Sequence, residues 1–252
     1  MPPEAQARLF PHLELVMLAP NTALYDSGAP RRHLYFPVDA IISLDQILEN
    51  GSSAGISMVG NEGVVGIASF MGSQFSPWRA VSQNAGAAYR LPGSIMQDEF
   101  DRHAGVLKLM LLYTQSRTTQ ISQMAVCNRH HSIEQQLCRW LLFSLDRLSG
   151  NRLHMTQENI GNILGVRREG VTVAANKLSR NGAIEYSRGE ITVLDRSKLE
   201  CMSCECYDVV KREFDRLLPQ VMTPNAIEAS AVFHWTEKKH IRSGHGFAYS
   251  MA

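Results

Sequence analysis

The feature that most limits the possible folds is an abrupt change in residue pattern at Pro92. Before it, in residues 20–92, short apolar runs alternate with glycine, proline and asparagine turns. After it, residues 94–148 contain no proline and a single glycine, Gly105. Frequent turns favour a compact all-β domain, whereas a long stretch without helix breakers favours helices. We therefore predict an α+β fold, with strands at residues 34–36, 41–44, 56–59 and 64–67.

Two helices are predicted after the β-domain, the second over residues 132–148. Apolar residues at helical spacing form a stripe on the first, which Thr114 and Arg117 interrupt. The stripe has two interpretations: the helix packs on its own β-domain, or it is the seam of a two-helix dimer whose polar residues set specificity. The dimer interpretation assigns the seam to Leu107, Met110, Arg117, Ile121 and Met124.

The strongest local signal lies in residues 155–174. Thr156 can cap a helix, and Met155 and Ile160 stand where a hydrophobic staple would close over that cap. The helix is expected to end near Leu164, and Gly165 can supply a turn with positive φ. A second helix then begins near residue 168. Residues 183–186 and 190–194 read as two strands around a tight turn, so the segment is predicted to be a winged helix-turn-helix.

The second helix of such a pair fits the major groove of DNA, with its N-terminal residues nearest the bases. Between residues 139 and 198, basic residues outnumber acidic ones, which agrees with a polyanionic partner. We predict double-stranded DNA as that partner. The predicted contact residues are Thr156, Gln157, Arg167, Arg168, Glu169, Thr172, Asn176, Lys177 and, at the wing tip, Arg188.

Residues 155–169, MTQENIGNILGVRRE, resemble the DNA-binding domain of the Crp–Fnr superfamily of bacterial transcription regulators. The resemblance extends over roughly residues 15–207. It implies an N-terminal double-stranded β-roll of the cyclic-nucleotide-binding type, a long dimerisation helix and a C-terminal winged helix. The expected parts are residues 1–100, 101–148 and 149–218, with an extension at 219–252.

The resemblance also implies function. A homodimer would place two recognition helices in successive major grooves of a two-fold symmetric site, and an activator would contact RNA polymerase. The base-reading arginine and glutamate of the family correspond to Arg168 and Glu169. Two positions depart from the family pattern: Val173 replaces a further arginine, and Arg167 replaces a usual serine cap. The chain is therefore expected to bind a DNA sequence other than the one best known for the family.

Cyclic nucleotide is not expected to bind. Family members that bind it use a Gly-Glu pair and an Arg-Ser or Arg-Thr pair, and here these positions are Gly66-Ile67 and Ser76-Pro77. Both charged anchors are missing, although Arg79 lies three residues from the expected place. A phosphate without a cation would be poorly compensated.

The five cysteines leave a further alternative, a metal- or redox-sensing regulator. Cys201, Cys204 and Cys206 could hold zinc or an iron–sulfur cluster if Cys127, Cys138 or a histidine supplied a fourth ligand. A helix that begins by Glu205 would, however, turn Cys204 and Cys206 to different faces. His130 and His131 are interpreted as solvated. We therefore predict no metal and no cofactor.

The remaining function classes are weaker. A cupin-like β-roll enzyme would bind metal through several histidines, but the β-domain has a single histidine, His33, between residues 21 and 92. We therefore do not expect an enzyme. An interaction module without DNA binding would leave Arg167 and Arg168 without a role. The N-terminus lacks the pattern of a signal peptide, and no apolar run reaches the roughly 18–20 residues of a membrane span, so a cytoplasmic protein is expected.

Overall fold

The computed structural model describes residues 1–218, except 31, 74 and 103–104. The predicted C-terminal extension, residues 219–252, lies outside the described residues. The β-domain and its flanking helices are α1 (Pro3–Leu9), η1 (Phe10–His12), β1 (Glu14–Leu18), β2 (Ala23–Tyr25), β3 (His33–Pro37), β4 (Ile42–Ile47), β5 (Ser53–Val59), η2 (Ile67–Ser69), β6 (Arg79–Ser82), β7 (Gly86–Pro92) and α2 (Gly93–Asp101). The later elements are α3 (Gly105–His130), α4 (Ile133–Leu145), β8 (Arg152–His154), α5 (Gln157–Leu164), α6 (Arg168–Arg180), β9 (Ile184–Ser187), β10 (Glu190–Val193), α7 (Arg196–Met202) and α8 (Cys206–Leu217).

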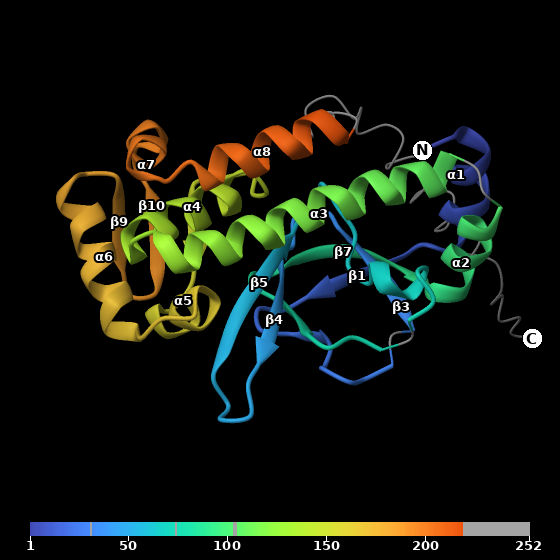
Figure 1. Cartoon of the computed structure of the whole chain (residues 1–252), viewed down its shortest axis with the longest axis horizontal. Helices are drawn as coiled ribbons and strands as arrows, with labels where there is room; N and C mark the ends of the chain where they lie inside the picture. Colours follow the sequence, from blue (N-terminus) through green and yellow to red (C-terminus); the bar gives the residue numbers. More distant parts are fainter. Residues whose placement is uncertain (31, 74, 103–104, 219–252) are drawn as a thin grey trace, which may run out of the picture. The chain divides into compact units, whose positions relative to one another are not determined.

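Two antiparallel sheets form the N-terminal roll (Figure 1). One sheet has the strand order β1-β7-β3, and the other has the order β2-β6-β4-β5. Alternate residues of the strands point between the sheets, where Leu18, Ile42 and Val59 belong to one buried apolar cluster. The predicted α+β class and β-roll are confirmed.

One predicted strand is wrong. Residues 64–67 pair with the roll through a single isolated bridge, between Tyr35 and Val65, and then enter η2. Gly66 explains the difference, because its φ of 100° lies in the left-handed region, which extended backbone does not use. The apolar character of the run is still accounted for, since Val64 and Val65 are buried.

The long helix α3 packs on the roll, and α8 packs along α3 (Figure 1). Met110 and Tyr113 of α3 lie in one apolar cluster with Leu34 of β3 and Met96 of α2. Phe214 of α8 packs against the same cluster. Of the two interpretations of the α3 stripe, the structure therefore supports packing on the β-domain for at least part of it.

A further buried cluster joins the winged helix to α4 and also includes Ile41 and Met58 of the roll. Leu137 and Trp140 of α4 are buried in one cluster with Ile160, Val171 and Leu178 of the helix-turn-helix. Ser132 caps α4 in a reciprocal capping box with Gln135. Helix α4 thus packs with the winged helix, which is expected from the sequence to begin at residue 149.

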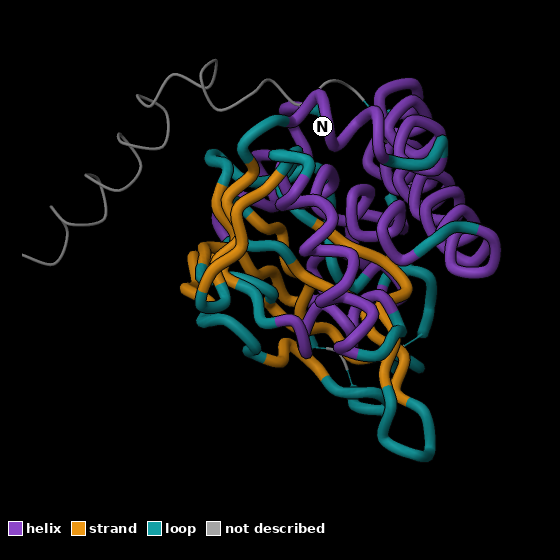
Figure 2. Tube along the Cα trace, turned by 90° about the vertical axis from the view of Figure 1, so that its left-hand side faces the viewer, coloured by secondary structure: helices purple, strands orange, loops and turns teal. Residues whose placement is uncertain are grey.

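The β4–β5 hairpin extends beyond the other strands of the roll and contacts the helix-turn-helix (Figures 1 and 2). A Cβ atom added at Gly55 would lie 2.9 Å from the carbonyl oxygen of Ile163 in α5. A Cβ at Gly165 would lie 3.2 Å from that of Ala54. The sheet edge and the turn between the two helices therefore lie in direct contact.

None of the helices within the described ranges is long and apolar enough to cross a bilayer.

Candidate nucleic-acid interface

The first helix of the pair, α5, begins as its sequence predicts. The Thr156 side chain accepts a hydrogen bond from the backbone N–H of Asn159 over 3.1 Å. Met155 and Ile160, the predicted staple, are both buried. Glu158 lies in the first turn, where the helix dipole favours a carboxylate. These local contacts fix the N-terminus of α5, whose other first-turn N–H groups are left to bind an anion or water.

The turn between α5 and α6 depends on two glycines. Gly165 has a φ of 67° and ends α5 by donating its N–H to the carbonyl of Gly161. A side chain at Gly161 would place its Cβ 2.9 Å from the carbonyl oxygen of Val166. The corner can therefore be this tight only where both residues lack a side chain.

Helix α6 buries one face and exposes the other. Val171, Ala174 and Leu178 pack into the core of the winged helix. The opposite face holds Glu169, Val173 and Asn176, all exposed. The spacing of three and four residues gives each face a continuous stripe along the helix.

Two arginines stand exposed at the start of α6. Arg167 is the N-cap residue, with extended backbone, and Arg168 is the first residue of the helix. Arg188 is also exposed, at the tip of the wing. Within the described part of the chain, the guanidinium groups of these three residues form no ion pair with a carboxylate. Their charges thus remain available to an external anion.

The wing has three strands, of which the sequence predicted two. β9 and β10 pair on either side of a turn in which Arg188 has a φ of 50° and Gly189 a φ of 81°. Positive φ at both central positions is the pattern of a type I′ hairpin turn. The unpredicted strand β8 pairs with β10 on the other side. It has three residues, too few for a clear alternating pattern.

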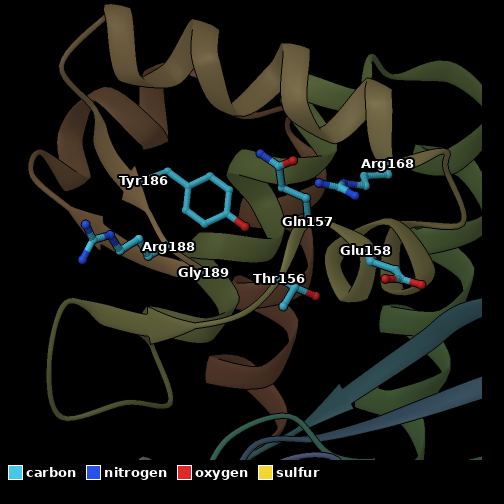
Figure 3. Close-up of a pocket in the computed structure, with 7 residues that line it drawn as sticks. All are labelled: Thr156, Gln157, Glu158, Arg168, Tyr186, Arg188 and Gly189. Atoms are coloured by element: carbon cyan, nitrogen blue, oxygen red, sulfur yellow. The ribbon is translucent and has the colours of Figure 1, made fainter.

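Four of the nine predicted contact residues, Thr156, Gln157, Arg168 and Arg188, line an open hollow of about 440 Å³ (Figure 3). The other five do not line it. It lies between the N-terminus of α5, the first residue of α6 and the wing. Arg168 is on one side of it and Arg188 on the other (Figure 3). The lining residues are Thr156, Gln157, Glu158, Arg168, Tyr186, Arg188 and Gly189.

Several predicted contact residues already have partners within the domain. Lys177 forms an ion pair with Glu134 at the start of α4. The Thr172 hydroxyl donates to the side-chain oxygen of Gln157 over 2.7 Å, which links α6 to α5. A role of Lys177 at DNA would therefore require it to leave Glu134.

The predicted dimer residues do not share one exposed face of α3. Met110 and Arg117 are buried, and the Arg117 guanidinium donates to the carbonyl of Met58 and to Gln120. These two side chains face the β-domain of the same chain, because β5 packs on this side of α3. Met110 and Arg117 are therefore not open to a second copy of the chain. Leu107, Ile121 and Met124 are half-buried.

The structure also brings together four of the ligands that the metal-sensing alternative considered. The ligand atoms of Cys127, His131, Cys204 and Cys206 lie within 4.8 Å of one another. Cys201 is exposed and outside this group. A hydrogen bond between Cys127 and Cys204 lowers the pKa of Cys204 to about 5. The same bond, together with burial, raises the pKa of Cys127, against the opposing charge of Arg139.

Two predictions about these residues are corrected. Cys204 and Cys206 point toward the same group, because Cys204 precedes the first turn of α8 and does not follow helical geometry. His131 is not solvated, since its side chain is 15% exposed and contacts Cys206. The missed signal was the spacing of four between Cys127 and His131, which puts both on one helix face.

The residues of the roll do not fit a cyclic nucleotide. Ser76, at the position expected for the phosphate-binding arginine, is buried. The nearby Arg79 pairs with Asp26 at 2.9 Å. Between α3 and the roll the space is filled, since a Cβ at Gly63 would lie 2.3 Å from the Tyr113 hydroxyl. The positions expected to supply the charged anchors therefore supply none, and the nearby Arg79 already pairs with a carboxylate.

Comparison with known proteins agrees with this architecture. Residues 135–202 match the model of the Crp-like helix-turn-helix domain. The chain has 15% sequence identity to FixK2 from Bradyrhizobium japonicum, with a TM-score of 0.64 over 76% of this chain and 98% of that one. A putative transcriptional regulator of the Crp/Fnr family from Eubacterium rectale has 17% identity and a TM-score of 0.62 over 80% and 94% of the two chains.

A Crp-family transcriptional regulator from Thermus thermophilus has 17% identity and a TM-score of 0.63 over 75% of this chain and 96% of that one. At these identities the likeness establishes the fold. No curated protein sequence matches the chain.

Proposed function

We propose that this chain, a Crp/Fnr-type transcription regulator with a Crp-like helix-turn-helix domain, binds two-fold symmetric DNA as a homodimer. The main support is the pair of exposed arginines at the start of α6, Arg167 and Arg168, which have no carboxylate partner among the described residues. A basic pair at the N-terminus of an exposed helix matches the acceptors on guanine in the major groove.

Helix α6 would lie in the major groove with its exposed stripe toward the bases. Its 13 residues form a helix about 20 Å long, which fits a groove about 12 Å wide. Arg168 would donate to a guanine and Glu169 would accept from a cytosine amino group. Asn176, about two turns further along, would reach an adenine or the backbone.

A DNA phosphate would occupy the hollow between α5, α6 and the wing. The first-turn N–H groups of α5 supply donors, and the helix dipole favours an anion there. Arg188, on the wing side of the hollow, adds a positive charge. Glu158 at the rim is exposed and can turn into solvent. This phosphate contact would hold the register of α6 in the groove.

The second copy would pack on the exposed side of α3. Exposed residues recur there at alternating steps of three and four, which is the heptad spacing of a coiled coil. They are Lys108, Leu111, Gln115, Thr118, Ser122 and Ala125. Leu111, which is 54% exposed, is the large apolar side chain at these positions and would be covered by the second copy. Such a seam would pair two winged helices for half-sites about 34 Å apart.

The test is a set of arginine variants measured on DNA selected from a random pool by the wild-type chain. Arg168→Ala should cost about 1–3 kcal/mol on the selected sequence and relax base preference at one position of each half-site. Arg188→Ala should weaken all sequences about equally and reduce the slope of log affinity against log salt by about one for each phosphate that it no longer neutralises. Fluorescence anisotropy over a salt series measures both effects.

Arg212→Ala is the matched control, because Arg212 is exposed on α8, outside the interface. It should leave affinity and salt slope unchanged. If Arg168→Ala binds every sequence as the wild type does, the assignment of α6 as the recognition helix is wrong. If the wild type selects no sequence, the proposed function itself fails.

A further inference from the structure

From the packing of α8 on α3, we infer a tetrahedral zinc site formed by Cys127, His131, Cys204 and Cys206. The proposed DNA interface uses none of these residues. Cys127 lies in the last turn of α3, and His131 directly follows the helix, where its N–H still donates to the carbonyl of Cys127. Cys204 and Cys206 come from the junction between α7 and α8. Zinc would therefore join the end of the long helix to the segment that follows the wing.

The spacing of the ligand atoms matches one four-coordinate ion. The Sγ atoms of Cys127 and Cys204 are 3.5 Å apart, and the Sγ of Cys206 is 3.4 Å from the Nδ1 of His131. Bonds of about 2.3 Å from zinc to sulfur give tetrahedron edges of about 3.8 Å. All four ligand atoms lie within 4.8 Å of one another, so small side-chain shifts complete the tetrahedron.

The same compactness disfavours an iron–sulfur cluster. In such clusters the four ligands are divided among two or four iron atoms, and ligands of different iron atoms lie farther apart than the ligands of a single ion. Three thiolates and one imidazole form a common donor set of structural zinc. Because zinc does not change its oxidation state, the site would hold the two segments together without requiring an electron donor.

Groups around the ligands are arranged as a metal site requires. The Nε2 of His131 is 3.4 Å from the Glu205 carboxylate, and its Nδ1 faces Cys206. This is the carboxylate–histidine–metal arrangement, in which the outer carboxylate orients the ring and selects the nitrogen that binds the ion. The Gln123 amide donates to the Cys206 sulfur over 3.2 Å. Such N–H···S bonds stabilise sulfur in its anionic form.

A positively charged side chain could also balance the net charge of the site. Zinc with three thiolates and a neutral imidazole carries one negative charge. Arg139 of α4 is 2% exposed, and its Nε and Nη1 atoms have no hydrogen-bond partner among the described residues. Its charge acts on the Cys127 thiol. A buried guanidinium without partners is costly, and an anionic metal site beside it would reduce that cost.

Bound zinc would connect α3, the helix of the proposed dimer, to the winged helix. Helix α7 packs on α4 in the winged-helix core, whereas α8 packs along α3. The junction of α7 and α8 supplies two ligands, and the end of α3 supplies the other two. Bound zinc would therefore restrain the winged helix relative to α3, and its removal should loosen α8.

The experiment measures metal in the full chain, purified without oxygen and supplied with zinc. Elemental analysis should find about one zinc per chain. Cys127→Ser and Cys204→Ser should each lose most of that zinc, whereas Cys201→Ser, an exposed cysteine outside the group, should keep it. Cobalt added in place of zinc should give the intense visible absorption of a tetrahedral thiolate site.

His131→Cys is the control for loss of zinc that results only from misfolding of a variant. It keeps four ligands, so it should retain about one zinc and strengthen the sulfur-to-cobalt charge-transfer band. Hydrogen exchange of the wild type before and after removal of zinc by a chelator adds a second readout. Exchange in α8 should become faster, while exchange in β7, at the centre of its sheet, should not change.

Three results would overturn the assignment. Zinc content near zero after metal supply, with all thiols free, would mean that the group binds no ion. Iron with acid-labile sulfide would identify a cluster instead. A disulfide between Cys127 and Cys204 in the protein as purified would identify a redox pair. None of these results depends on DNA binding, so the proposed function stands or fails separately.

Discussion

Val173 is 71% exposed on α6, an unusual position for an apolar side chain in a face otherwise lined with charged and polar groups. It lies one turn after Glu169 and shortly before Asn176, on the stripe that would face the bases. In the major groove, apolar side chains distinguish thymine by its methyl group. Val173 is therefore expected to contact a thymine in each half-site.

Val173→Arg tests this contact. Replacing the methyl contact with a bidentate donor should change the preferred base at one position of each half-site from thymine to guanine. The discrimination gained should be about 1–3 kcal/mol. Sequences selected from a random pool by the two proteins measure the change.

The matched control is Val209→Arg, which introduces the same charge on an exposed position of α8. It should select the same sequences as the wild type. An unchanged base preference in Val173→Arg would contradict the placement of this residue at the bases, whatever its effect on affinity.

The contact between β5 and α5 connects the roll to the DNA-binding domain. Its close approach depends on Gly55, since a Cβ there would lie 2.9 Å from the backbone oxygen of Ile163. The atom in the way belongs to a helix backbone, so it cannot move aside as a flexible side chain would. The two elements would have to separate by a few tenths of an ångström.

Gly55→Ala should therefore destabilise the chain by about 1–3 kcal/mol, the usual cost of overpacking. Thermal unfolding measures the loss, and faster hydrogen exchange in the β4–β5 hairpin locates it. Gly150→Ala is the control, because a Cβ at Gly150 would meet nothing within 4 Å. Equal stability of the two variants would mean that this contact is not close in solution.

Pairing of two chains would depend on the exposed side of α3, since its other sides are covered by the roll and by α8. Leu111 is the large apolar residue of the heptad positions, and it is 54% exposed. A carboxylate there would face its own copy across a two-fold axis, where like charges repel and lose solvation.

Leu111→Glu should convert the dimer to a monomer and weaken binding to a two-half-site DNA by at least about tenfold, because a single winged helix has only one set of contacts. Sedimentation velocity measures the mass. Leu48→Glu, at a leucine 55% exposed in the β4–β5 turn, should remain dimeric. A wild-type chain that is a monomer at micromolar concentration and on DNA would contradict the homodimer.

Much of the helix-turn-helix could be predicted because its determinants are local. The cap at Thr156, the positive φ at Gly165 and the apolar spacing of α6 all lie within a few residues of the backbone that they control. The roll was predicted more coarsely. Turn residues indicated strands but did not show that Gly66 would end one of them, since its φ depends on neighbours in the folded chain.

The sequence alone predicted the order of the parts, the corner between α5 and α6, and the arginines at the start of α6. Each follows from short-range backbone and side-chain preferences. Tertiary structure decided which face of α3 is free. It also brought Cys127 and His131 together with Cys204 and Cys206. Cys127 and Cys204 are 77 positions apart in the sequence. No local preference links them, because the packing of α8 along α3 depends on how all the apolar surfaces of the chain are buried together.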